Sequence, residues 1–278
     1  MVEEYLAARR EMVESYLEAY LKARARELPQ TLHQAIAYAL EGGKRLRPIL
    51  VLAAAEALGG DAEEVLPTAG AFELFHTYSL IHDDLPALDD ADLRRDQLTV
   101  HRVFGEAAAL LAGDALIPLG FELIAKEQAR ISPEDRVLRV IGLVSEALGP
   151  AGMVGGQLLE LEERFADPEA LEEIYSKKTA ALLGAATAAG AVLTGGGEGE
   201  VTALHRFGLC LGLAYQLIDD LLDLGEDEGP TYVHLVGERE GREEAERLTG
   251  EALQALASLG NGAANLRALA RWLLSRRS

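Results

Sequence analysis

Two short groups of aspartates are the strongest chemical signal in this 278-residue chain. Together they hold ten of the 14 aspartates, whereas the 32 glutamates are scattered. The first group is Asp83, Asp84, Asp89, Asp90, Asp92 and Asp96, and the second is Asp219, Asp220, Asp223 and Asp227. Adjacent carboxylates repel one another, so each group favours a cation with hard oxygen ligands, for which Mg²⁺ is the best fit.

Spacing indicates which aspartates act together. Asp219 and Asp223 are four residues apart, so they share one helix face about a turn apart. Asp83 and Asp89 are six residues apart, which is about 240° of rotation on an ideal helix. Pro86 lies between them and breaks the helical ladder, so we expect the chain to bulge and bring Asp89 back towards Asp83. A solvated helix end explains either group alone, but two groups that each follow a long apolar helix favour a functional site.

The few lysines and some of the arginines lie where anions bind. There are only five lysines, and Lys44 stands in the run Gly42-Gly43-Lys44-Arg45-Leu46-Arg47-Pro48. At a helix start this run offers free backbone N–H groups and positive side chains. Arg94-Arg95 adds planar guanidinium groups that can clamp phosphate. Together with two aspartate groups that favour Mg²⁺, these positively charged side chains indicate a diphosphate site.

Composition and periodicity predict an all-α protein. Ala, Leu and Glu dominate, and the chain shows no period-2 strand, no repeat and no linker long enough to separate domains. We therefore expect a single domain, residues 1–278, built as one large bundle of about ten helices. The expected helices span about 3–27, 32–40, 47–58, 61–82, 105–130, 134–148, 152–164, 168–195, 199–224, 240–258 and 263–276.

Charge and composition exclude several classes of protein. A net charge of −20 argues against nucleic-acid binding, and the single cysteine, Cys210, excludes an internal disulfide and a Cys-based zinc site. Residues 179–197 carry no charge, but they are mostly Ala, Gly and Thr, so we expect a buried helix and no membrane span. The first residues carry acids where a signal peptide carries bases, which predicts a cytoplasmic protein.

Taken together, the motifs resemble the trans-isoprenyl diphosphate synthases, the short-chain polyprenyl synthetase family, and are closest to its bacterial farnesyl and geranylgeranyl diphosphate synthases. The matching segments are Gly42 to Pro48, Tyr78 to Asp90, Leu93 to Arg95, Phe104 to Glu106, Leu111 to Leu116, Gly155 to Gln157, Lys178-Thr179 and Tyr215 to Asp223. The resemblance implies the isoprenoid synthase fold, an all-α bundle around a central cavity, normally as a homodimer. It also implies a prenyltransferase that condenses isopentenyl diphosphate with an allylic diphosphate.

The resemblance also implies roles for individual residues. About three Mg²⁺ ions would be held by Asp83, Asp84 and Asp89 on one wall and by Asp219, Asp220 and Asp223 on the other. Isopentenyl diphosphate would bind Lys44, Arg47, His76 and Arg95. Arg94 and Lys178 would stabilise the leaving diphosphate, and Thr179 and Gln216 would direct oxygen dipoles at the allylic cation. His76 taken alone also fits a hydrogen-bonded core histidine.

Product length would depend on the residues beneath the first aspartate group. Helix geometry puts Ser79 directly below Asp83, but in the family the fifth residue before this aspartate, here Tyr78, often blocks the pocket. An aromatic residue there implies a C15 product, with C20 as the near alternative. The other interpretation is that Tyr78 only packs against a neighbouring helix.

The sequence departs from the family pattern at three places. Asp96 stands where glycine is usual after the arginine pair, and Glu160 stands where aspartate is usual. After Asp223 the loop is short, with Glu226, Asp227 and Glu228, and with Gly229 where lysine is usual. These changes leave two alternatives to an active synthase. One is a weakly active or non-catalytic subunit that modulates a partner synthase, and the other is a class I terpene cyclase.

Overall fold

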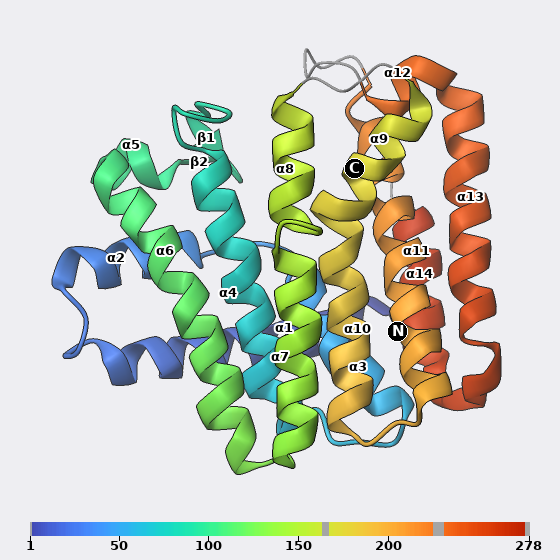
Figure 1. Ribbon diagram of the computed structural model, residues 1–278, viewed down its shortest axis with the longest axis horizontal. Coiled ribbons are helices and arrows are strands. Elements are labelled where there is room, and N and C mark those ends of the chain that lie inside the picture. The colour runs from blue at the N-terminus through green and yellow to red at the C-terminus, as the bar shows by residue number, and fades with distance from the viewer. Residues whose placement is uncertain (1, 163–166, 225–230, 276–278) are drawn as a thin grey trace. The chain divides into compact units, whose positions relative to one another are not determined.

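The computed structural model describes residues 2–162, 167–224 and 231–275, and it is helical nearly throughout (Figure 1). The prediction of an all-α fold is confirmed. The α-helices of the described residues are α1 (Val2–Arg24), α2 (Gln30–Ala39), α3 (Leu46–Ala57), α4 (Leu66–Asp83), α5 (Val100–Phe104), α6 (Glu106–Glu122), α7 (Glu134–Leu148), α8 (Met153–Leu161), α9 (Pro168–Tyr175), α10 (Ala181–Leu193), α11 (Glu198–Leu222), α12 (Tyr232–Val236), α13 (Glu238–Ala255) and α14 (Ala264–Leu274). Short 3₁₀ turns are η1 (Glu63–Val65), η3 (Gln128–Arg130) and η5 (Ala257–Ala263), and π-helical turns are η2 (Leu123–Glu127) and η4 (Ser176–Ala180).

A small β-hairpin follows the first aspartate group, where the sequence indicates no strand. Strands β1 (Leu93–Arg94) and β2 (Gln97–Leu98) pair antiparallel, with Leu93 opposite Leu98. The turn residues Arg95 and Asp96 have φ angles of 56° and 63°. Two-residue hairpin turns favour positive φ, which glycine, asparagine and aspartate accept most readily. The prediction of no strand is wrong here because two-residue strands are too short to show alternation.

The chain divides into two compact units. The N-terminal unit comprises Leu6–Ile49 and Glu63–Ser132, and the C-terminal unit comprises Met1–Tyr5, Leu50–Ala62 and Pro133–Ser278. Each unit carries one of the two aspartate groups. The single domain expected over residues 1–278 stays a prediction.

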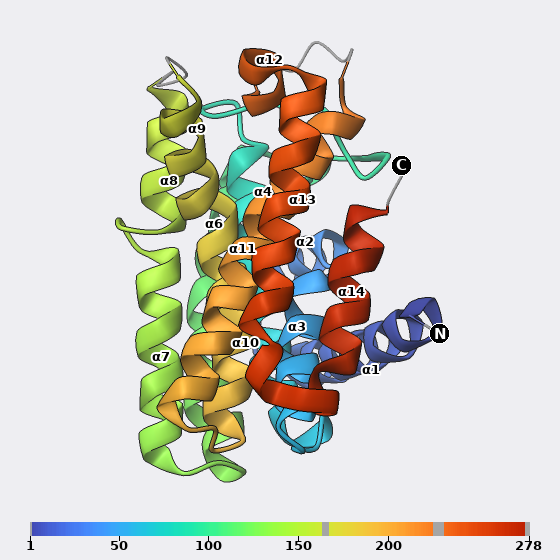
Figure 2. The same cartoon turned by 90° about the vertical axis from the view of Figure 1, so that its right-hand side faces the viewer.

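Helix α4 forms the centre of the N-terminal unit. Twelve of its residues are buried, and glycines of α6 allow that helix to pack closely against it. A Cβ on Gly120 would lie 2.5 Å from the Phe75 ring, and one on Gly113 would lie 2.1 Å from the His82 ring. α4 and α6 lie side by side in both views (Figures 1 and 2). This packing fixes the helix that ends at Asp83.

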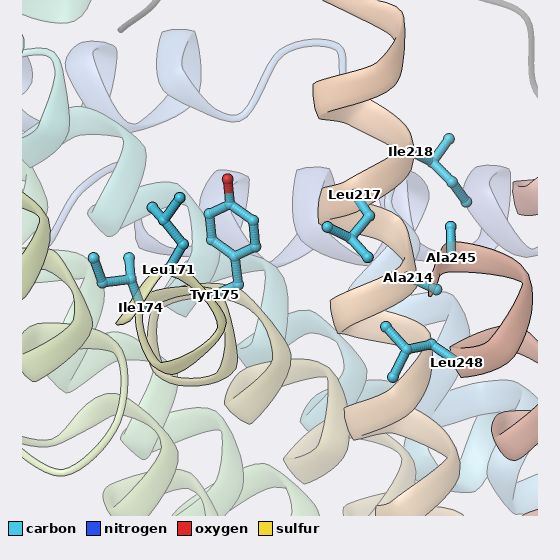
Figure 3. Packing of buried hydrophobic residues seen from close by; sticks show 8 residues of the cluster. All are labelled: Leu171, Ile174, Tyr175, Ala214, Leu217, Ile218, Ala245 and Leu248. Atoms are coloured by element: carbon cyan, nitrogen blue, oxygen red, sulfur yellow. The ribbon is translucent and has the colours of Figure 1, made fainter. Parts of the chain in front are cut away.

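The C-terminal unit is built around α10 and α11, which pack through small residues. A Cβ on Gly208 would lie 2.5 Å from the carbonyl oxygen of Leu183, and one on Gly212 would lie 2.6 Å from the Cα of Ala180. On its other side α11 packs against α13 and α9, and the apolar side chains of this contact are shown in Figure 3. They are Leu171, Ile174, Tyr175, Ala214, Leu217, Ile218, Ala245 and Leu248.

Most of the uncharged stretch 179–197 forms α10 (Ala181–Leu193), and every residue from Leu182 to Leu193 is buried, as expected for a helix inside a bundle. By length and composition alone, three other helical stretches are long and apolar enough to cross a membrane. They are Glu106–Arg130, Glu134–Leu161 and Glu198–Leu222. The expectation of no membrane span stays a prediction.

Candidate active site

The first aspartate group lies where α4 ends and the chain turns back. The backbone N–H of Asp89 donates to the carbonyl oxygen of Asp83 at 2.9 Å, so the bulge expected at Pro86 does return the chain. Asp83 is half-buried and Asp89 is exposed. The structure thus brings the backbones of these two predicted metal ligands together in one turn.

Asp84 points into the N-terminal unit. It is 3% exposed, and Oδ1 accepts two bonds from Arg94, from Nε at 2.9 Å and Nη2 at 2.6 Å. Burial raises the pKa of Asp84, and the Arg94 charge opposes that rise. Arg94, which the resemblance assigns to the diphosphate, is therefore held by a carboxylate of the predicted metal site.

The glycine pair before Lys44 supports Arg95. Gly42 and Gly43 have φ angles of 69° and 93°, which residues with a Cβ rarely adopt. The Arg95 guanidinium donates to the carbonyl oxygen of Gly42 at 3.2 Å, and a Cβ on Gly43 would lie 2.5 Å from its Nη1. Lys44 is exposed and Arg47 is half-buried. The loop therefore orients Arg95 through the Gly42 carbonyl, and the adjoining residues Lys44 and Arg47 add two more positive charges.

His76 lies among these cations on α4. Burial lowers its pKa well below the usual value, and the charges of Arg47, Arg95, Arg45 and Arg94 lower it further. Its Nδ1 is buried and has no hydrogen-bond partner among the described residues. The alternative of a hydrogen-bonded core histidine therefore lacks support at this atom. A neutral imidazole beside several guanidinium groups suits a diphosphate, because one ring nitrogen can donate to an oxygen.

The depressed pKa of His76 predicts a pH dependence of stability. Below about pH 6.5 the unfolded chain binds a proton at this residue and the folded chain does not, so stability falls as the pH falls. One such group contributes a slope of up to about 1.4 kcal/mol per pH unit. We expect His76→Gln to remove that part of the slope in urea unfolding between pH 6.5 and 5. Burial also lowers the pKa of His205. His205 is present in the unaltered protein and in His76→Gln, so the difference between their two slopes reports on His76. Equal slopes would contradict the assignment.

The two candidate chain-length residues, Ser79 and Tyr78, lie on α4 four and five residues before Asp83. Tyr78 is 6% exposed, and its ring centroid lies 5.8 Å from that of His82 in an edge contact. Burial, and secondarily the charge of Asp83, raises the pKa of Tyr78 to about 12. Ser79 is half-buried, and its hydroxyl donates to the carbonyl oxygen of His76 at 2.9 Å. The bulk at this level of α4 thus comes from Tyr78.

A cleft of the N-terminal unit joins several of these groups. Asp84, Arg94, Arg95 and Gly42 line it, together with Thr77 from α4. Its remaining lining residues are Tyr38, Ala39, Glu41, Leu80, Ile81, Gln97, Leu98, Thr99 and Val100. The hairpin and the loop at Gly42 therefore form walls of one cleft.

The second aspartate group ends α11 in the C-terminal unit. Asp219 is half-buried, and Asp223 is exposed and donates its backbone N–H to the Asp219 carbonyl oxygen at 3.0 Å. Asp220 points inward, where it accepts from the Tyr175 hydroxyl at 2.7 Å and from Gln216 Nε2 at 3.3 Å. Burial raises the pKa of Asp220 to about 6, although both hydrogen bonds lower it. The protein thus contacts both carboxylate oxygens of Asp220.

The catalytic candidates of the C-terminal unit are linked by hydrogen bonds. Thr179 donates to Gln216 Oε1 at 3.1 Å, and Gln216 in turn donates to Asp220. Tyr175, which sequence reasoning missed, also accepts from the backbone N–H of Tyr232 at 3.2 Å. Its one sequence signal is its position one turn before Lys178. The network fixes the oxygen atoms of Thr179 and Gln216 relative to the end of α11.

Lys178 lies in the π-helical turn η4 and pairs with Glu160 of α8. The extra residue of a π-helical turn is common at functional sites. A Cβ on Gly156 would lie 2.5 Å from the backbone nitrogen of Lys178. Gly156, in the Gly155-Gly156-Gln157 motif, therefore lets α8 contact the backbone of this turn.

Gly156→Ala tests the importance of that contact. The new methyl group meets backbone atoms that cannot rotate away, so η4 must shift. Overpacking of this kind costs about 1–3 kcal/mol. A shift of about 1 Å at Lys178 lowers kcat by as much as about 100-fold. The matched control is Gly250→Ala on α13, where nothing lies within 4 Å of the new Cβ. The control gains about 0.5–1 kcal/mol in urea unfolding and keeps its kcat. Equal kcat in both variants contradicts the role of Gly156.

The donor set of the two aspartate groups fits Mg²⁺. Asp83 and Asp89, and likewise Asp219 and Asp223, offer hard carboxylate oxygens on half-buried or exposed side chains. Among residues 2–162, 167–224 and 231–275, no group of three or more His, Cys, Asp or Glu side chains is arranged to hold a metal ion. The acids Glu226, Asp227 and Glu228, and Gly229, lie outside the described residues. The metal-binding roles remain predictions.

The whole chain is similar to proteins of one family. Residues 29–231 match the family described as polyprenyl synthetase. The chain belongs to the polyprenyl synthetase family. A dimethylallyltranstransferase from Fischerella ambigua (strain UTEX 1903) is 44% identical over 291 residues, which cover 98% of this chain and 83% of that protein. Geranylgeranyl pyrophosphate synthase 12, chloroplastic, from Arabidopsis thaliana is 42% identical over 269 residues, which cover 89% of this chain and 75% of that protein. The crystal structure of a geranyltransferase from Legionella pneumophila superposes with a TM-score of 0.91 at 34% identity. The match covers 100% of this chain and 97% of that chain.

This polyprenyl synthetase is a short-chain trans-prenyltransferase of the farnesyl and geranylgeranyl diphosphate synthase type. The family implies prenyl diphosphate substrates. The relatives' names differ in the prenyl chain they imply, so the product of this enzyme depends on its own pocket residues.

Proposed function

We propose that this polyprenyl synthetase condenses isopentenyl diphosphate with dimethylallyl and geranyl diphosphate to give farnesyl diphosphate. The observation that carries the C15 product is the bulk of Tyr78, a buried ring on α4 five residues before Asp83. A pocket floored by this ring stops a chain that grows along α4. A C20 product is the second candidate, since a relative 42% identical is named a geranylgeranyl pyrophosphate synthase.

The N-terminal unit binds isopentenyl diphosphate in this proposal. Lys44, Arg47 and Arg95 supply positive charge, and neutral His76 supplies one hydrogen bond to a phosphate oxygen. Arg95 is held on the Gly42 carbonyl, so its guanidinium is oriented before the substrate arrives. Orientation of this kind reduces the entropy lost on binding.

Two sets of residues serve the allylic substrate. Arg94 and Lys178 stabilise its diphosphate while the C–O bond breaks and the electron pair leaves with oxygen. Thr179 and Gln216 direct oxygen dipoles at the allylic cation, their orientation fixed by the bonds to each other and to Asp220. The double bond of isopentenyl diphosphate then forms the new C–C bond, and a proton is lost to the departing diphosphate. Asp83, Asp84, Asp89 and Asp219, with Asp220 and Asp223 in support, would hold Mg²⁺, which would supply charge that neutralises the diphosphate.

An elongation assay tests the function. Purified protein is incubated with Mg²⁺, labelled isopentenyl diphosphate and dimethylallyl, geranyl or farnesyl diphosphate, and the dephosphorylated products are resolved against length standards. We expect C15 from the first two primers and little elongation of the third. A main product of C20 supports the second candidate. No elongation without a partner synthase, or a cyclised hydrocarbon without isopentenyl uptake, overturns the proposal.

We also propose that the enzyme is a homodimer in the cytoplasm. The family resemblance supports the dimer. Sedimentation analysis of the purified protein and fractionation of the producing cell test the two statements. A monomer, or recovery with membranes, contradicts them.

A further inference from the structure

The loop between α2 and α3 has an unusual backbone that one buried arginine holds in place. Three of its residues have positive φ: Gly42, Gly43 and Arg45, the last at 52°. Arginine carries a Cβ, so this conformation persists only where the surroundings enforce it. Arg45 is 5% exposed, whereas its neighbour Lys44 is exposed. The loop therefore turns the Arg45 side chain inward, where its guanidinium group contacts other residues of the N-terminal unit.

The Arg45 guanidinium contacts three helices of the N-terminal unit. Nη1 donates to Glu73 Oε1 on α4 at 2.6 Å, and Nη2 donates to the carbonyl oxygen of Leu40, the C-cap of α2. Nε lies 3.5 Å from a carboxylate oxygen of Glu14 on α1. The Glu73 side chain is 1% exposed, and its other oxygen, Oε2, has no hydrogen-bond partner among the described residues. Arg45 therefore forms an ion pair with the buried Glu73 carboxylate, and a buried charge requires such a partner.

The proposed isopentenyl diphosphate residues all lie beside this pair. Lys44 and Arg47 flank Arg45 in the sequence, and Arg95 rests on the Gly42 carbonyl of the same loop. His76 is three residues after Glu73 on α4, so it lies on nearly the same helix face. Movement of the loop relative to α4 would separate these groups.

We propose that Arg45 and Glu73 are positioning residues, which lock the loop 41–45 onto α4 so that Lys44, Arg47, Arg95 and His76 converge on one diphosphate. The inference rests on the proposed function of that site. Neither residue touches the substrate. Their loss weakens binding of isopentenyl diphosphate and leaves binding of the allylic substrate and the saturated rate nearly unchanged.

Arg45→Lys is the first test, because it keeps the positive charge and loses the planar fork. We expect KM for isopentenyl diphosphate to rise about tenfold to 100-fold, as for other misplacements of about 1 Å. KM for geranyl diphosphate and kcat should change less than threefold. Glu73→Gln, which keeps one hydrogen bond and the side-chain shape, should give a smaller rise in the same constant.

Two further variants separate positioning from general stability. Arg24→Lys disturbs another ion pair of the same unit, Arg24 to Glu122 at 2.7 Å, and should leave both KM values unchanged. The double variant Arg45→Met/Glu73→Leu replaces the buried pair by apolar side chains and should recover stability to urea. It should not recover the affinity for isopentenyl diphosphate.

The outcomes are distinct. Recovery of affinity together with stability, an equal rise of both KM values, or an unchanged KM in folded Arg45→Lys overturns the positioning role. Failure of the unaltered enzyme to elongate any primer overturns the proposed function instead. If Arg45→Lys does not fold, Glu73→Gln and the double variant decide the question by calorimetric titration with isopentenyl diphosphate.

Discussion

Asp83→Asn will lower kcat for the condensation by about 100-fold to 1,000-fold, the usual cost of losing one group that stabilises transition-state charge. Asparagine keeps the size and the helix end, so the turn that returns Asp89 to Asp83 should survive. It removes one negative charge and one proposed Mg²⁺ ligand, so the leaving diphosphate should carry more uncompensated charge. Steady-state rates at saturating substrates and at several Mg²⁺ concentrations measure the effect. Higher Mg²⁺ should restore part of the loss.

The matched control is Asp92→Asn, in the same segment. Asp92 is exposed and pairs with Arg102, and no role in the reaction is assigned to it. We expect its kcat to stay within about twofold, since surface ion pairs contribute little. A loss at Asp92 equal to that at Asp83 would show that overall charge, and not ligation, is responsible.

Tyr78→Ala should shift the main product from C15 to C20 and longer. The ring is buried on α4, and its removal leaves space at the level where, in the proposed function, the growing chain stops. Loss of a buried aromatic costs about 3–5 kcal/mol of folding stability, so the products are best compared at low temperature. The dephosphorylated alcohols, resolved against length standards, give the distribution.

Tyr78→Phe and Tyr78→Leu make the product test quantitative. Phenylalanine keeps the ring and should keep C15 as the main product. Leucine should give a mixture with more C20, because it fills part of the space. An unchanged distribution in Tyr78→Ala means that Tyr78 only packs against its neighbours, and the floor of the pocket then lies elsewhere.

Much of the helical structure could be predicted from local signals. Helix α7 coincides with the expected range 134–148, because Pro133 precedes it and Gly149 ends it. The sequence predicts one helix over 168–195, whereas the structure contains α9, the π-helical turn η4 and α10 in succession. The turn has no local sequence signal. It lies where Gly156 of α8 and Gly212 of α11 approach the backbone of residues 178–180, which only the folded packing reveals.

The proposed chemistry could be predicted from the sequence alone, on the basis of carboxylates in two groups, a glycine pair before cations, and a proline that returns Asp89 to Asp83. These features follow from residue type and spacing along one short segment, so no distant partner is needed to predict them. Which of these side chains face inward depends on packing between elements that are distant in the sequence. Asp84, Asp220 and Arg45 look like their neighbours in sequence, yet each is turned to a partner on another element: Arg94, Tyr175 and Glu73. For Asp84 and Asp220, at the ends of helices, adjacent side chains are rotated by about 100°, and the element packed against each face selects the one that is buried. Arg45 lies in the loop before α3, where its positive φ turns the side chain inward.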